Sequence, residues 1–213
     1  MRRSALEYTG HELPLFLDAA NWKRYWVSQL RPFVTGDVLE VGAGLGANTA
    51  LLKNSAVRSI HCLEPDEALA DQLRATVRGD PAITVSAGTI DSVSGTSFDA
   101  VLYIDVLEHI EDDKGELARA ARLLKTGGRL IVLAPAHQAL FSAFDKAIGH
   151  HRRYDRRSLS ACSPPSAWLE NMWYLDCVGL LASAGPRRAQ PNGRPPDRSA
   201  CLRRLVGLSR WSR

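Results

Sequence analysis

The chain has 213 residues, of which 45% are hydrophobic and 23% are charged, and its formal net charge is +4. This composition excludes a disordered chain, and the length suffices for a domain with its own core. No apolar run is long enough to span a membrane, and no apolar segment of the signal-peptide type follows the charged start. The four cysteines lack zinc-ligand spacing, so we expect reduced thiols in a cytoplasmic protein, and no metal.

The positive charge is concentrated near the end of the sequence. Residues 187–213 contain eight arginines and one acid, Asp197, so the remainder is mildly acidic. The same stretch is rich in proline and poor in apolar residues, which predicts a basic, disordered tail over residues 186–213. A tail that grips nucleic acid or a membrane is the alternative.

In chain order, the first predicted element is a helical segment at residues 13–30, which carries an aromatic cluster and gives an N-terminal helical cap over residues 1–36. From residue 37, short apolar runs alternate with amphipathic ones, which is the pattern of strands and helices around a parallel sheet. We expect strands at residues 38–41, 59–63, 83–86, 100–104 and 129–133, and helices at residues 48–53, 67–77 and 114–124.

The second half of the sequence is less regular. Residues 134–159 predict a long loop with short helices, and one more strand is expected at residues 168–176. No convincing strand follows it. The predicted fold is therefore an α/β three-layer sandwich with a mostly parallel sheet over residues 37–185, and we expect its C-terminal strands to be incomplete.

A glycine-rich turn, VLEVGAGLGANTALL, joins the first predicted strand to a helix. Gly42, Gly44 and Gly46 let a ligand lie directly on the main chain beside a helix N-terminus. The turn also fits a dinucleotide fingerprint, with Glu64 as its ribose acid. Glu40 favours S-adenosylmethionine over NAD, because a carboxylate here repels a pyrophosphate and attracts an ammonium and a sulfonium. The alternative is that Glu40 caps a neighbouring backbone group.

An ordered set of motifs resembles the class I, Rossmann-like S-adenosylmethionine-dependent methyltransferases, in the broad group that contains small-molecule methyltransferases of the ubiquinone-biosynthesis type. The motifs are LEVGAGLGANT, LEPD, GTID and FDAVLYIDVLEHIEDD, followed by a fifth strand in LLKTGGRLIVLAP. The resemblance implies an enzyme that methylates a small-molecule acceptor on oxygen or nitrogen. A non-catalytic cofactor-binding or scaffold protein is the alternative, and the irregular C-terminal region favours it.

The resemblance also implies roles in cofactor binding. Glu40 and the glycine turn would hold the methionine end, Glu64 would bond both ribose hydroxyls, and Asp105 would approach the methionine amino group. Many family members have an adenine-binding Asp where this chain has Thr89, so we expect Ile90 to stack on the adenine and Asp91 to bond it. The predicted cofactor set is Glu40, Gly42, Ala43, Gly44, Gly46, Asn48, Glu64, Pro65, Asp66, Thr89, Ile90, Asp91 and Asp105.

Histidines near the ends of the strands are candidates for removing a proton from the acceptor. His109 comes first, with a buried structural histidine as the alternative. The sequence HHRRY adds His151 and Tyr154, and its arginines suit an anionic acceptor unless the loop is merely solvated. Methylation of nucleic acid is discounted, because the Ser-Pro-Pro-Ser sequence is misplaced and lacks the aromatic residue on which a flipped base stacks.

Overall fold

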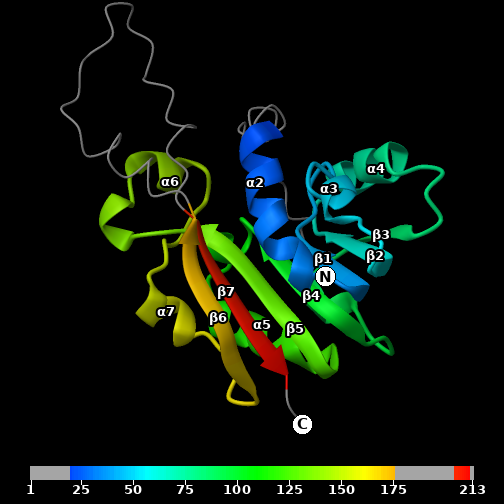
Figure 1. The fold of residues 1–213 in the computed structure, drawn as a ribbon. Helices are drawn as coiled ribbons and strands as arrows, with labels where there is room; N and C mark the ends of the chain where they lie inside the picture. The colour runs from blue at the N-terminus through cyan, green and yellow to red at the C-terminus, as the bar shows by residue number, and fades with distance from the viewer. Residues whose placement is uncertain (1–19, 176–203, 212–213) are drawn as a thin grey trace, which may run out of the picture.

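A seven-stranded sheet organises the computed structural model, which describes residues 20–175 and 204–211 (Figure 1). The strand order is β3-β2-β1-β4-β5-β7-β6. Strands β1 to β5 are parallel, whereas β7 runs antiparallel to both β5 and β6. The strands are β1 Gly36–Val41, β2 Val57–Glu64, β3 Ile83–Ala87, β4 Phe98–Ile104, β5 Leu124–Pro135, β6 Ala167–Leu175 and β7 Arg204–Trp211. The predicted α/β class and mostly parallel sheet are confirmed.

The helices are short, and several begin at side-chain caps. Asp66 accepts hydrogen bonds from the N–H groups of Ala68 and Leu69 at the start of α4, and Asp112 accepts one from Gly115 at the start of α5. The α-helices are α2 Ala20–Leu30, α3 Thr49–Leu52, α4 Glu67–Thr76, α5 Asp113–Arg122, α6 Ala143–Ala147 and α7 Arg156–Ser160. The 3₁₀ turns are η1 Arg31–Phe33, η2 Ile90–Ser92, η3 Leu107–His109 and η4 Gln138–Leu140. None of the described helices is long and apolar enough to cross a membrane.

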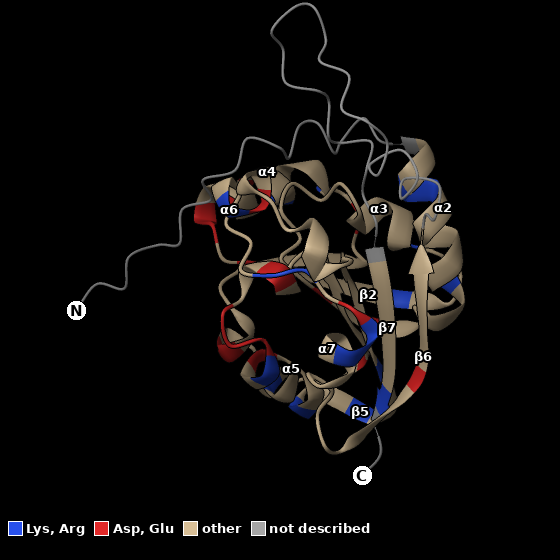
Figure 2. Ribbon diagram, turned by 90° about the vertical axis from the view of Figure 1, so that its left-hand side faces the viewer, with Lys and Arg blue, Asp and Glu red and all other residues tan. Residues whose placement is uncertain are grey.

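Two apolar clusters fill the space on either face of the sheet. One joins the sheet to α2, α3 and α4 and includes Leu30, Leu52 and Leu73. The other joins it to α5 and α7 and includes Leu117 and Leu159. Figure 2 shows α5 and α7 on one side of β7 and α2 on the other. Successive residues of a strand point to opposite faces, so each central strand contributes to both clusters.

The C-terminal region corrects the sequence prediction. Residues 204–211 form β7, which lies between β5 and β6 (Figure 1), and Leu205, Val206 and Leu208 are completely buried. This stretch is therefore neither a disordered tail nor a missing strand. The prediction failed because the strand contains Gly207 and Ser209 and adjoins several arginines, which dilute its apolar pattern. The rest of the predicted tail, and residues 1–19 of the predicted cap, lie outside the described residues.

The strand order reverses at β1, which pairs with β2 on one side and with β4 on the other. From β1 the chain builds outwards to β2 and β3, and it then returns to add β4 and β5 on the opposite side. In open α/β sheets the loops diverge at such a point and leave a ligand-binding crevice at the carboxyl ends of the strands. The end of β1 and the end of β4 are therefore the place to look for a site.

Candidate functional site

The glycine turn after β1 is held against the end of β2 by backbone hydrogen bonds. The N–H groups of Gly42 and Ala43 donate to the carbonyl of Leu63, over 2.7 and 3.2 Å. Gly42 has a φ of +67°, and a Cβ there would lie 2.6 Å from a methyl group of Val106, which follows β4. Glycine is needed here on both counts. The contact also shows that the loop after β4 packs directly on the turn.

Glu40 is buried on the helix-α3 side of β1. Its carboxylate accepts a 2.6 Å hydrogen bond from the Thr49 hydroxyl, and the Cys62 thiol lies 3.8 Å away. Burial raises the pKa of Glu40 to about 7, although the Thr49 and Cys62 bonds oppose the rise. These partners are side chains rather than a backbone group. A cation placed beside Glu40 would favour its ionised form.

Glu64 links the end of β2 to the glycine turn. Its Oε2 accepts a 2.8 Å hydrogen bond from the Gly44 N–H, and its Oε1 accepts one of 3.0 Å from the Asp66 N–H. Burial raises the pKa of Glu64, while these backbone bonds lower it in part. Each oxygen has a second lone pair, so a diol can still bond to both. The predicted members Ala43, Asn48 and Pro65 lie in the turn, before α3 and beside Glu64.

The residues that follow β3 include the expected adenine contacts. Thr89 and Asp91 are exposed, and Asp91 lies 3.4 Å from the Arg119 guanidinium. The Ile90 side chain is 2% exposed and packs in the cluster beneath α5, which corrects the expectation that it stacks on an adenine. Its apolar character serves the core, so a ligand at this edge would meet Thr89, Asp91 and the backbone.

Asp105 follows β4 in the left-handed region, with a φ of +56°, and its N–H donates to the Leu133 carbonyl over 2.8 Å. Such a conformation is uncommon outside glycine, although aspartate adopts it more readily than most residues. Lys23 of α2 is 7% exposed; burial lowers its pKa, and the negative charge of Asp105 partly opposes this. Sequence reasoning missed Lys23. Arg24 follows it directly, so the sequence does not single out Lys23 as the buried one of the two.

The loop after β5 returns to the end of β4 and brings two histidines together. The rings of His109 and His150 lie 4.6 Å apart in an edge-on arrangement. His151 next to them is exposed, although its N–H donates to the Glu108 carbonyl over 2.8 Å. Of the sequence candidates, His109 is thus in a cluster at the end of the strand, and His151 is presented to solvent.

Tyr154 is not placed for catalysis, contrary to the sequence prediction. Its side chain is 1% exposed, and its hydroxyl donates to the Asp113 carboxylate over 2.9 Å. Burial and the Asp113 charge both raise the Tyr154 pKa. Arg152 pairs with Asp113 over 2.6 Å and Arg153 pairs with Asp145 over 2.8 Å. The arginines therefore tie the loop to buried acids, which removes the observation that suggested an anionic acceptor.

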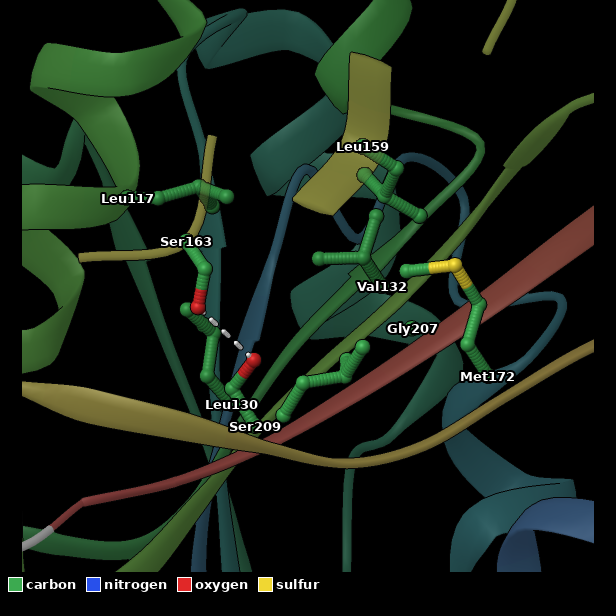
Figure 3. Close-up of a pocket in the computed structure, with 9 residues that line it drawn as sticks. Leu117, Leu130, Val132, Leu159, Ser163, Met172, Gly207 and Ser209 are labelled. Atoms are coloured by element: carbon green, nitrogen blue, oxygen red, sulfur yellow. Dashed lines mark hydrogen bonds between the residues drawn. The ribbon is translucent and has the colours of Figure 1, made fainter. Parts of the chain in front are cut away.

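A small apolar gap beneath α7 lies outside this site (Figure 3). It lies on the α5 and α7 face, where Gly207 and Ser209 of β7 leave space, and the Ser163 and Ser209 hydroxyls bond across one end over 3.2 Å. Its lining contains no titratable residue and none of the predicted site residues; it comprises Leu117, Leu130, Val132, Leu159, Ser163, Leu169, Met172, Gly207 and Ser209. It is a packing gap rather than a catalytic pocket.

Comparison with known proteins agrees with this geometry. Residues 39–132 match the family model described as a methyltransferase domain. The demethylmenaquinone methyltransferase of Tropheryma whipplei (strain Twist) is 32% identical over 143 residues, which are 66% of this chain and 59% of that protein. The ubiquinone biosynthesis O-methyltransferase of Paracidovorax citrulli is 34% identical over 108 residues, or 48% of this chain and 45% of that protein.

Among solved structures, the N-methyltransferase NodS of Bradyrhizobium japonicum WM9, in complex with S-adenosyl-L-homocysteine, superposes with a TM-score of 0.70 at 15% identity. The match covers 97% of this chain and 95% of that chain. The chain spans less than two thirds of the length of the curated relatives named above. The resemblance seen in the motifs is confirmed over residues 39–132, which match the methyltransferase-domain model, and the sheet has the mostly parallel α/β arrangement that the resemblance implies.

Proposed function

We propose that this chain is an S-adenosylmethionine-dependent methyltransferase that acts on a small-molecule acceptor. The observation that carries the proposal is the arrangement of two buried acids around one glycine turn, at the point where the strand order reverses. Glu40 lies on the side of α3 and Glu64 at the end of β2, so a ligand on the turn has a carboxylate at each end. A cationic methionine end and a ribose diol match these two acids.

The proposed cofactor would supply a methyl group bound to a sulfonium. An acceptor atom would attack that methyl carbon in line with the C–S bond, and S-adenosylhomocysteine would leave with the bonding electrons. Glu40 and the glycine turn would hold the charged methionine end of the cofactor, Glu64 would bond both ribose hydroxyls, and Asp105 would approach the amino group. The chain then has to align the acceptor and exclude water. The loop after β4 borders the turn, where Val106 lies against Gly42, and the loop after β5 is joined to it by the bond from His151 to Glu108. We therefore place the acceptor between these loops.

The acceptor is proposed to be a small molecule that is methylated on oxygen or nitrogen. The curated relatives are named for demethylmenaquinone and for ubiquinone biosynthesis, so quinones of these two kinds come first in an acceptor screen. We place the protein in the cytoplasm, because Cys62 and Cys162 are buried free thiols.

Calorimetric titration of the purified chain with S-adenosylhomocysteine and with NAD tests the cofactor assignment. Binding of S-adenosylhomocysteine but not of NAD supports the proposal and justifies the acceptor screen. Binding of NAD alone would assign the turn to a dinucleotide. A folded chain that binds neither compound would support the alternative of a non-catalytic scaffold, and far-UV circular dichroism establishes the folded state beforehand.

A further inference from the structure

Three metal-ligating side chains meet beside the proposed cofactor site. Glu108 and His109 belong to η3, and His150 comes from the loop after α6. Their donor atoms all lie within 4.8 Å of one another, and Glu108 Oε1 is 3.8 Å from His150 Nε2. We propose that these residues bind a divalent transition metal ion, with Zn²⁺ as the best match. The sequence shows no zinc spacing because the ligands are far apart along the chain.

His150 is oriented for this role by a buried acid. Its Nδ1 lies 3.1 Å from Oδ1 of Asp145, whose side chain is 1% exposed. Histidines that bind metals generally donate their other ring N–H to a carboxylate, which fixes the ring and directs the free nitrogen to the ion. Here the Asp145 contact directs Nε2 towards Glu108. The carboxylate–histidine pair of a metal site is therefore already in place.

Asp145 is itself held firmly. It accepts hydrogen bonds of 2.8 Å from both the N–H and the hydroxyl of Ser142, and the Arg153 guanidinium donates to both of its oxygens, over 2.8 and 3.0 Å. Arg153 offsets the charge of Asp145, and the three ligands together offer one carboxylate and two imidazoles. This is the His₂Glu donor set found in catalytic zinc sites.

The distances require only a local adjustment. Bonds of about 2.0–2.2 Å to a tetrahedral zinc ion bring its donor atoms to roughly 3.4 Å from one another. Glu108 and His150 are near this separation at 3.8 Å, so the larger movement falls on the half-buried His109. The backbone bond from His151 to Glu108 keeps the two segments together while His109 moves.

The same contacts allow another explanation, in which a protonated His150 bridges Asp145 and Glu108 as an ion pair. That explanation does not use the His109 imidazole as a ligand, whereas the metal site does. His109→Ala therefore separates the two. With three protein ligands, a tetrahedral ion keeps one position open, and this would suit an acceptor oxygen if the proposed methyl transfer is correct.

The test uses the full chain after dialysis against a chelator. Zn²⁺ is added in a calorimeter, and Co²⁺ is followed by its visible absorption, which reports the coordination geometry. We expect one ion per chain. The variants His109→Ala, His150→Ala and Glu108→Gln should abolish binding or weaken it strongly, and Asp145→Asn should weaken it about ten- to a hundredfold. His151→Ala, which changes an exposed neighbour, should bind like the wild type and is the matched control.

A folded wild-type chain that takes up no Zn²⁺ would overturn the inference, as would binding that survives both His109→Ala and His150→Ala. Glu108→Gln conserves shape and remains informative if an alanine variant fails to fold. Titration of the metal-free chain with S-adenosylhomocysteine keeps the two proposals separate. Binding of S-adenosylhomocysteine without binding of zinc refutes this inference alone. Binding of zinc without binding of S-adenosylhomocysteine refutes the proposed function alone.

Discussion

The carboxylate of Glu64 on β2 accepts a 2.8 Å hydrogen bond from the backbone N–H of Gly44 in the turn after β1. One acid thus fixes the shape of the turn from the neighbouring strand while keeping lone pairs for a ligand. The side chain that would hold a ribose also prepares the backbone beside it. Removal of this side chain should therefore affect ligand binding in two ways.

Glu64→Ala should weaken binding of S-adenosylhomocysteine by about 1–3 kcal/mol, because a buried acceptor of hydrogen bonds is lost. Calorimetric titration measures the change. Glu67→Ala is the control, since Glu67 is an exposed acid at the start of α4 nearby. Unchanged affinity in Glu64→Ala would exclude Glu64 from the site.

Glu40 should make the protein less stable as the pH rises. Its pKa is raised by burial from 4.5 to about 7, so in this interval the folded chain holds a proton that the unfolded chain has released. The free energy of unfolding therefore falls through this interval by roughly 3 kcal/mol and levels off above it. Glu40→Gln should remove this part of the slope. Urea denaturation across the pH range measures it.

Glu64 has a raised pKa as well and contributes in the same direction, so the comparison must be between wild type and Glu40→Gln rather than with a flat line. A variant with the same pH dependence as the wild type would show that Glu40 is ionised in the folded chain throughout.

Tyr154→Phe should cost stability and leave chemistry intact. The variant loses the hydrogen bond to Asp113, which keeps its 2.6 Å ion pair with Arg152, so the expected cost is about 1–2 kcal/mol. Binding of S-adenosylhomocysteine and methyl transfer should be unchanged. Tyr174→Phe, at an exposed tyrosine, is the control for stability. A loss of turnover with no loss of stability would return Tyr154 to the list of catalytic candidates.

The strand β7 should be essential for folding. Leu208 is completely buried, and Leu208→Ala should lower the free energy of unfolding by about 2–5 kcal/mol in urea denaturation. Trp168→Ala on β6 is the control, because Trp168 is 48% exposed and should cost far less. Deletion of residues from 204 onwards should prevent stable folding. A truncated chain that still binds S-adenosylhomocysteine would show that the strand is dispensable.

The first five strands were predictable because each is a short apolar run that ends in a turn, and burial on both faces makes such runs nearly continuous. The location of Glu40 and Glu64 was predictable for the same reason. Both acids stand near the carboxyl end of a parallel strand, and these ends lie together at one edge of the sheet. The strand β7 was not predicted, because glycine and serine occupy alternate positions on one of its faces and interrupt the apolar pattern. Its neighbours in the sheet, rather than its own composition, make it a strand.

Side-chain pairing was beyond the reach of the sequence. Nothing in HHRRY indicates that Arg152 and Arg153 are bound to Asp113 and Asp145, or that His150 faces Glu108. Those contacts depend on how a long loop returns to the sheet. Ile90 shows a second limit of the sequence. An apolar residue next to a binding loop can pack in the core or against a ligand, and the sequence pattern is the same in both cases.

The position of β7 also bears on the order in which the chain is built up during synthesis. β6 leaves the ribosome first, yet among the described residues it pairs with β7 alone, and β7 separates it from β5. Until β7 emerges, β6 has no strand to join and β5 presents an open edge with Leu130 to Leu133 unpaired on one side. Nascent chains that pause in this interval would expose an unpaired strand edge that is prone to aggregation, and chaperones that bind extended apolar segments would bind it.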